Sequence, residues 1–487
     1  MFILDTKGRQ PLHDKIYNYI KKQILSGELP PATKLLSIKN LSIELSVSRN
    51  TVEYAYHQLY AEGYIHSKPR SGYYVSLIDQ EFLPSSHQHI GATQEKVTED
   101  RKTYSFDFHP ASLSPASFPV NLWRKLYIDC LKEDPKHLAF YSHQQGDFTL
   151  RCEIQRYLAR SRGVSCDPEQ IVVCSGLQDS LSILAPILRE NHSIFAIEDP
   201  GYFVPKAVFQ NHSFSLTPVH VDSDGLDLEY LKNTKSTVVY VTPSHQFPLG
   251  YVMPVANRLK LIDWAETVGG VIIEDDYDSE LRYSGKPIPA LQGLHPTGNI
   301  VYVGTFSKVL SPALRVSYMV LPYPLLTRYR KLFSDYYTNV SLLEQRTLSK
   351  FMEQGYWERH LRKMRTVYKK KHDALIQSIH HHFGSRVNII GQGAGLHVVL
   401  ELVGNSLNEA ELMKRAQERD VRLIPLSGAY MHNNGNNPQI MLGFGSMNSA
   451  EIDRGIELLY KAWYSTDKKV SHLDVMLNWL NKQQNGG

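Results

Sequence analysis

The chain has 487 residues, 42% hydrophobic and 21% charged, which excludes wholesale disorder and leads us to expect more than one domain. No apolar run reaches the roughly 18 residues of a membrane helix, and the N-terminus lacks a secretory signal, so we expect a cytoplasmic protein without membrane contact. The net charge of +4 is carried entirely by residues 1–78, which hold ten Lys or Arg and six Asp or Glu, and this pattern is typical of a module that binds a polyanion.

The first 77 residues predict three helices followed by a two-stranded wing. Apolar residues recur at helical spacing, Gly27 is a good stop signal and Ser48 a good N-cap, which places the helices at about 11–26, 38–45 and 48–62. Two short strands, 64–67 and 72–75, flank a basic turn, Lys68-Pro69-Arg70-Ser71.

This arrangement predicts DNA contact through the third helix. A helix can enter the major groove, where its first residues contact base edges. The polar face of this helix is formed by Ser48, Arg49, Asn50, Thr51, Tyr54 and His57. Basic side chains elsewhere suit phosphates, or the minor groove in the case of the wing: Lys39, Lys68 and Arg70. Spacing alone leaves open a plain helical bundle with a solvated charged face.

The string VSRNTVEYAYHQLYAEGYIHSKPRSGYYV resembles the winged-helix domain of the GntR superfamily of bacterial regulators. The resemblance implies an operator of double-stranded DNA as partner. One departure is Lys39, where the family has arginine; lysine keeps the charge but loses the planar fork.

Residues 78–104 lose all periodicity and have the composition of a linker. From 105 to 487 short Val- and Ile-rich runs alternate with amphipathic helical stretches, which predicts an α/β domain with a mostly parallel sheet. The expected strands include 171–174, 194–197, 237–241, 271–273 and 300–303. The four cysteines fit no zinc-binding spacing, and we expect reduced thiols and no metal site.

Lys308 is the strongest candidate for chemistry in this second domain. It follows the predicted strand 300–303 in the string Gly-Thr-Phe-Ser-Lys, and Arg315 comes shortly after it. A lysine whose pKa is lowered by desolvation or a nearby cation is nucleophilic and forms a Schiff base with an aldehyde. The hydroxyls of Thr305 and Ser307, with Arg315, suit a phosphate group.

Three other segments also follow predicted strands, at the edge of the sheet where α/β proteins bind ligands. Asp275 suits a protonated pyridine nitrogen and Tyr277 a phenolate oxygen; a calcium site is discounted because the EF-hand spacing is absent. Ser175, Gly176, Leu177 and Gln178 mark a helix start that can bind phosphate, and Tyr202 can stack on a ring.

Together these segments resemble the fold-type I aminotransferase family across about 105–465, and their order along the chain agrees. A GntR winged helix fused to such a domain is identified as the MocR subfamily. The resemblance implies pyridoxal phosphate (PLP) bound to Lys308, with the phosphate near the residues named above. It also implies a head-to-tail homodimer, in which Tyr141 reaches the partner's phosphate.

Three departures bear on function. Phe247 replaces the asparagine that hydrogen-bonds the phenolate in catalytic aminotransferases, and His245 or Gln246 is expected to take over. Phe203 and Ser446 stand where arginine would bind a substrate carboxylate. We therefore predict a regulator of PLP-synthesis genes that senses PLP itself, as the PdxR type does, rather than an enzyme. The alternatives are a GabR-like amino-acid sensor, an active aminotransferase, and a DNA-binding protein with an inert large domain.

Overall fold

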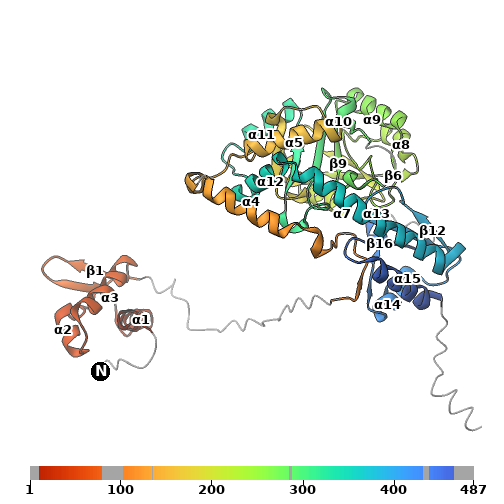
Figure 1. Cartoon of the computed structure of the whole chain (residues 1–487). Coiled ribbons are helices and arrows are strands. Elements are labelled where there is room, and N and C mark those ends of the chain that lie inside the picture. The colour runs from red at the N-terminus through yellow and green to blue at the C-terminus, as the bar shows by residue number, and fades with distance from the viewer. Residues whose placement is uncertain (1–9, 79–102, 134, 284–287, 432–437, 465–487) are drawn as a thin grey trace, which may run out of the picture. The chain divides into compact units, whose positions relative to one another are not determined.

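The computed structural model describes residues 10–78, 103–133, 135–283, 288–431 and 438–464 (Figure 1). The chain divides into two compact units, 1–101 and 102–487. Most of the predicted linker, residues 79–102, lies outside the described residues, as does the end of the predicted large domain, 465–487. None of the described helices is long and apolar enough to span a membrane.

The N-terminal unit is a three-helix module with a two-stranded wing. Its helices are α1 (Leu12–Leu25), α2 (Ile38–Glu44) and α3 (Arg49–Ala61), and its strands are β1 (Ile65–Lys68) and β2 (Gly72–Val75), which pair antiparallel. The Ser48 hydroxyl accepts a hydrogen bond from the Thr51 amide at 3.2 Å, as the cap prediction required. The prediction erred at Lys68, which belongs to β1 rather than to the turn, because it pairs with Gly72.

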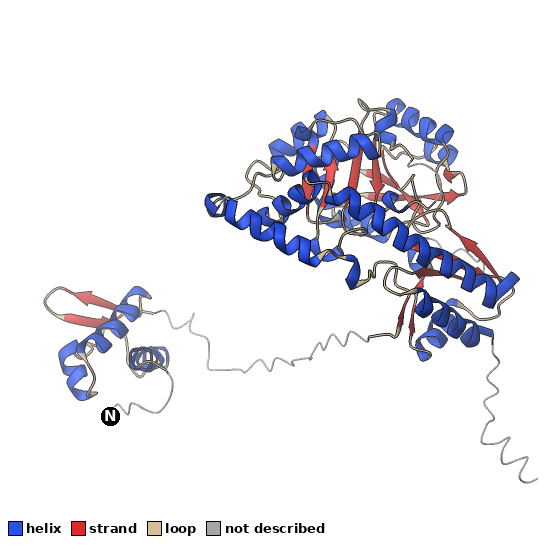
Figure 2. Ribbon diagram, in the orientation of Figure 1, coloured by secondary structure: helices blue, strands red, loops and turns tan. Residues whose placement is uncertain are grey.

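The large unit is built on an eight-stranded sheet in the order β4-β11-β10-β9-β8-β5-β6-β7. Figure 2 shows the strands in red among the blue helices. Its strands are β4 (Ile171–Cys174), β5 (Ile194–Asp199), β6 (Ser215–Asp222), β7 (Gly225–Leu226), β8 (Val238–Val241), β9 (Val271–Asp276), β10 (Ile300–Thr305) and β11 (Ser317–Val320). Strands β6, β5, β8, β9 and β10 run parallel, whereas β11 and β7 are antiparallel to their neighbours.

Both faces of this sheet are covered. Within β4, Ile171 and Val173 enter one hydrophobic core, and Val172 and Cys174 enter another. Burial on both faces explains the continuous apolar runs. The helices of the sheet region are α4 (Val120–Glu133), α5 (Phe148–Ser161), α6 (Leu177–Arg189), α7 (Phe203–Asn211), α8 (Leu228–Lys232), α9 (Val255–Thr267), α10 (Leu291–Leu294), α11 (Tyr323–Leu332) and α12 (Leu342–Glu353).

The long helix α13 (Tyr356–Phe383) leads into a smaller sheet, which consists of β12 (Val387–Ile390), β13 (His397–Leu402), β16 (Gln439–Gly443) and β15 (Ile424–Pro425) in that order. Two helices, α14 (Glu409–Glu418) and α15 (Ser449–Tyr464), accompany it. The short strand β3 (Phe106–Asp107) pairs with β14 (Val421–Arg422), so residues at opposite ends of the domain meet.

The predicted strands are all present, but three of them end later than expected, including β5, which ends at Asp199 rather than at 197. Glu274, Asp275 and Asp276 belong to β9 instead of following it, and Thr305 belongs to β10. Carboxylates are tolerated there because they have partners: Glu274 accepts from the amides of Leu291 and Gln292, at 2.8 and 3.1 Å.

Candidate cofactor pocket and DNA-binding face

A cavity opens at the carboxyl ends of β8, β9 and β10. Nine of its lining residues come from these strands or from the segments that follow them: Thr242, Phe247, Asp275, Tyr277, Val303, Gly304, Thr305, Ser307 and Lys308. Leu177, Tyr202, Arg315 and Ser317 complete the wall. The parallel strands therefore bring together side chains that lie far apart in the sequence, at the edge where α/β sheets bind ligands.

Lys308 lies just beyond β10 and is partly exposed in this cavity. Desolvation lowers the pKa of its ammonium group, while the nearby carboxylates of Asp278 and Asp275 act in the opposite direction. Its Nζ atom lies 3.4 Å from the Pro110 carbonyl oxygen and 5.9 Å from the centre of the Tyr277 ring. A larger fraction of neutral amine makes this lysine a better nucleophile than a solvated one.

Asp275 is a buried carboxyl in the wall of the cavity, with 4% of its surface exposed. The Tyr240 hydroxyl donates a hydrogen bond to its Oδ2 atom. Burial raises the pKa of Asp275 to about 7, although the Tyr240 hydrogen bond lowers it. A positive charge beside this carboxyl would restore its ionised form, so the site favours a cationic group such as a protonated ring nitrogen.

Aromatic rings form another part of the wall. The rings of Tyr202 and Phe247 are 5.0 Å apart, edge to face, and those of Phe247 and Tyr277 are 6.1 Å apart, also edge to face. Burial raises the pKa of the Tyr277 phenol well above its ordinary value, so this hydroxyl keeps its proton and remains a donor. The wall suits a flat aromatic ligand with an oxygen near Tyr277.

The remaining part of the cavity suits a phosphate. Helix α6 starts at Leu177, and the first amides of a helix have no intrahelical partner. The Arg315 guanidinium lies beside this helix start and donates to the Ser175 carbonyl at 3.2 Å. Gly176 has φ +86°, and a Cβ atom there would lie 2.1 Å from Arg315 Nη2. Only glycine permits this close approach.

Five predicted cofactor residues do not line the cavity. Ser175 and Gly176 lie behind Arg315, and Gln178 lies in the first turn of α6. Tyr141 is 81% exposed and stacks on Tyr337, with ring centres 4.4 Å apart. His245 was expected in the cavity, but it is 2% exposed and lies behind Tyr277, because Asp278 holds its ring there.

The sequence analysis missed Thr242, which lines the cavity, and Tyr240, which contacts Asp275. Thr242 lies directly after β8, at the same edge as the predicted residues, and this position was a usable signal. Tyr240 contacts Asp275 across neighbouring strands, and nothing in the sequence predicts that contact.

Phe203 and Ser446 are the positions where an arginine would bind a substrate carboxylate. The Phe203 side chain is 60% exposed, and the Ser446 hydroxyl donates to the Asp107 carbonyl at 2.9 Å. Arg422 lies 3.6 Å from the Asp107 carboxylate, which also accepts from the Ser112 hydroxyl. These contacts engage both Ser446 and Arg422 within the protein.

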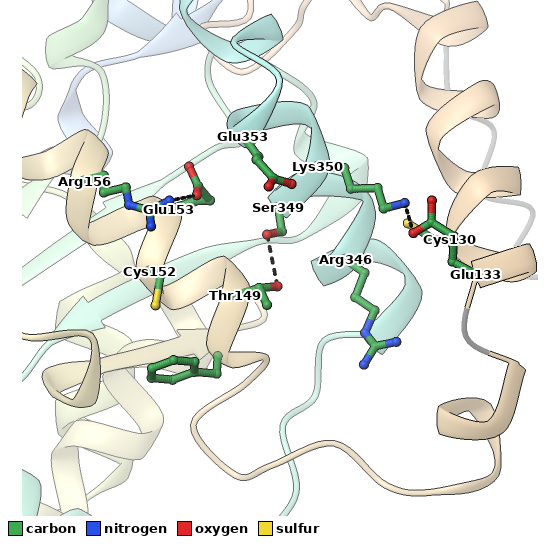
Figure 3. A pocket seen from close by; sticks show the side chains of 11 residues that line it. Cys130, Glu133, Thr149, Cys152, Glu153, Arg156, Arg346, Ser349, Lys350 and Glu353 are labelled. Atoms are coloured by element: carbon green, nitrogen blue, oxygen red, sulfur yellow. Dashed lines mark hydrogen bonds and ion pairs between the residues drawn. The ribbon is translucent and has the colours of Figure 1, made fainter.

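A larger hollow, of about 550 Å³ against about 130 Å³ for the cavity at Lys308, lies among α4, α5 and α12 (Figure 3). Most of its charged side chains pair with one another or with nearby residues: Lys350 with Glu133, Arg156 with Glu153, and Arg346 with Asp147. Size therefore favours the hollow, but the chemistry of the lining favours the cavity at Lys308 as the ligand site.

The predicted DNA-binding residues form an accessible surface on the N-terminal unit. Arg49, Asn50, Tyr54 and His57 are exposed on α3, while Val52, Ala55 and Leu59 on its other face are buried. Lys39, Lys68 and Arg70 are exposed, as is Ser48, and Thr51 is half-buried. Lys68 Nζ lies 4.6 Å from the centre of the Tyr74 ring, which holds this lysine on the wing.

Comparison with known proteins agrees with this two-part architecture. The family model for bacterial regulatory proteins of the gntR family matches residues 12–75, and that for aminotransferases of class I and II matches 114–459. A "probable rhizopine catabolism regulatory protein MocR" of Rhizobium meliloti is 32% identical over 96% of this chain and 97% of its own length. The chain belongs to the MocR subfamily of GntR-type regulators.

Other MocR-like relatives match over most of their length. The HTH-type transcriptional regulator YdeL of Bacillus subtilis is 38% identical, over 93% of this chain and 97% of its own. The pyridoxine biosynthesis regulator PdxR of Corynebacterium glutamicum is 30% identical, over 88% and 90%. The kynurenine aminotransferase of Pyrococcus horikoshii shares the fold, with a TM-score of 0.68 and 24% identity over 76% of this chain and 93% of that one.

The aminotransferase fold of this MocR-type chain implies PLP, and the residues present fit that group. The cavity combines a lysine amine, a buried carboxyl, a phenol and a helix start with an arginine. These are the complements of an aldehyde, a pyridine nitrogen, a phenolate and a phosphate. The described residues contain no group of three or more side chains arranged for a metal ion.

Proposed function

We propose that this protein is a transcription regulator that binds operator DNA through α3 and the wing, and senses PLP at Lys308 to control genes of PLP synthesis. The observation that carries the proposal is a cavity that combines a lysine amine, a buried carboxyl, a phenol and an arginine beside a helix start, in a chain with no arginine at 203 or 446. A bidentate arginine contact is worth about 1.5–3 kcal/mol, so the lack of both weakens amino-acid binding by about a hundredfold or more.

Most residues of the cavity have a defined task in this proposal. When bound, PLP supplies an aldehyde that an amine holds covalently with loss of one water. The Lys308 amine makes that link, and the Asp275 carboxylate pairs with the ring nitrogen. Tyr277 donates to the phenolate oxygen, and Tyr202 packs on the ring. Arg315, Thr305, Ser307 and the start of α6 hold the phosphate.

One relative supports a link between this chain and PLP synthesis. It is named as a regulator of pyridoxine biosynthesis, and it matches nearly the whole chain. We propose a head-to-tail homodimer, in which Tyr141 contacts the partner's cofactor. The Tyr141 ring stacks on Tyr337 but remains 81% exposed, so it is accessible to a second chain. PLP then acts by changing how the two DNA-binding modules are arranged.

The test is effector-dependent DNA binding by the full chain. A duplex that the protein selects from a random library is titrated with the protein alone and with PLP, PMP, GABA or common amino acids. We expect PLP to change the affinity and the others to have little effect. A response to an amino acid but none to PLP overturns the proposal and favours an amino-acid sensor. Turnover of amino donors with 2-oxo acids would instead identify an aminotransferase.

A further inference from the structure

Tyr277 in the cavity wall is connected to two polar side chains behind it, His245 and Asp278, which the PLP contacts do not explain. His245 follows β8, whereas Tyr277 and Asp278 follow β9. His245 Nδ1 lies 3.0 Å from both carboxylate oxygens of Asp278 and 3.0 Å from the Tyr277 hydroxyl oxygen. His245 and Asp278 are each 2% exposed, so water does not compete for these contacts.

The chemistry of this group determines where the hydrogens lie. A carboxylate only accepts hydrogen bonds, so the His245 nitrogen that faces Asp278 must carry a hydrogen. That nitrogen then has no lone pair to accept the Tyr277 proton. The Tyr277 hydroxyl is consequently left to donate elsewhere, and Tyr277 lines the cavity. His245 Nε2 is buried without a hydrogen-bond partner, which costs less for a lone pair than for an N–H group.

Two glycines keep the His245 ring in place. A Cβ atom on Gly395 would lie 2.3 Å from His245 Cε1 and 2.5 Å from Asp278 Oδ2. A Cβ atom on Gly250 would lie 3.1 Å from His245 Nε2. Both glycines have positive φ, +77° and +70°, so the loops that enclose the ring depend on them. The histidine is thus enclosed on the side away from Tyr277.

We propose that His245 and Asp278 are positioning residues: Asp278 sets the hydrogen on His245 Nδ1, and His245 thereby directs the Tyr277 hydroxyl toward the cofactor oxygen. The inference rests on the proposed function, because it needs PLP at Lys308. It also accounts for Phe247, whose ring has no hydrogen bond to offer. Phe247 cannot donate a hydrogen bond to the phenolate oxygen, and the directed hydroxyl of Tyr277 offsets that loss.

The consequence is measurable in the cofactor itself. A donor to the phenolate oxygen competes with the imine proton for that oxygen, so losing the donor makes the proton harder to remove. The pH midpoint of the cofactor's visible absorbance change reports this proton. The charged and titratable groups around His245 and Tyr277 are Asp275, Asp276, Asp278, Glu198, His397 and Lys308, and all remain unchanged in the His245 variants.

The experiment compares variants of the full chain loaded with PLP. We expect His245→Phe and Tyr277→Phe each to raise the midpoint by about one pH unit, a tenfold change in proton affinity. The double variant His245→Phe/Tyr277→Phe should shift no further than Tyr277→Phe alone, because both changes remove the same hydrogen bond. His245→Leu, which also removes the hydrogen-bonding ring, tests the same point if His245→Phe fails to fold.

The control is His192→Phe. His192 pairs with Thr237 at 2.8 Å, ahead of β5 and at the opposite edge of the sheet, so its loss should not move the midpoint. The inference is overturned if His245→Phe, or His245→Leu in its place, behaves like this control, or if the double variant shows additive shifts. Absence of the absorbance band in the unaltered protein would instead defeat the proposed function.

Discussion

The charge on Asp275 makes the affinity for PLP depend on pH in a predictable direction. Burial raises the pKa of the free carboxyl to about 7, so it is largely protonated at lower pH. A cationic ring nitrogen stabilises the ionised form, so binding below pH 7 must release this proton. The contribution of Asp275 is therefore complete above about pH 7, and it weakens binding by up to about tenfold for each unit below it.

Asp275→Asn removes the charge while keeping the shape and the contact with Tyr240. A hydrogen bond to a charged group is worth about 1.5–3 kcal/mol, so we expect PLP to bind roughly 10- to 150-fold more weakly at about pH 8. At about pH 6 the difference should shrink by about tenfold, because the unaltered carboxyl is then mostly protonated. The measurement is an absorbance titration of the full chain with PLP at both pH values.

The PLP phosphate and Lys308 also titrate, but they are present with the unaltered protein and with the Asp275→Asn variant alike. The ratio of the two PLP dissociation constants therefore reports the contribution of Asp275 alone. Asp263→Asn, which changes an exposed carboxylate on α9, is the matched control and should leave binding unchanged. A ratio that stays constant between about pH 6 and pH 8, or an Asp275→Asn variant that binds as tightly as the unaltered protein, would refute the reasoning.

Three further predictions address the lysine, the phosphate contact and the DNA. Lys308→Ala should abolish the absorbance band of covalently bound PLP; a surviving band means that another amine holds it. Gly176→Ala should weaken PLP binding at least about tenfold by displacing Arg315, whereas Gly163→Ala, where φ is also positive but no atom lies within 4 Å, should not. Arg49→Ala should relax sequence preference, and Lys68→Ala should lower the slope of log affinity against log salt by about 0.9, both measured by fluorescence anisotropy on a selected duplex.

Much of this protein could be predicted from local sequence. Buried strands of Val and Ile, such as 171–174 and 300–303, have a recognisable composition because both of their faces are covered. The Ser48 cap and the Gly176 turn depend on residues within a few positions, and both formed as expected. Lys308 and Asp275 were identifiable because parallel strands end at a common edge.

The direction of individual side chains depended on contacts between distant segments. His245 was expected in the cavity, but its ring pairs with Asp278 in the neighbouring loop. Arg315 reaches the start of α6, 140 residues away from Ser175 in the sequence, only because β11 pairs with β4.

The sequence by itself determined which elements form and which chemical groups the protein carries, because propensity, capping and strand composition are local properties. Tertiary structure alone decided that Tyr240 contacts Asp275 and that Asp278 holds His245 behind Tyr277. The physical reason is that the hydrogen bonds of a buried polar group depend on which donors and acceptors the packed strands bring within about 3 Å of it.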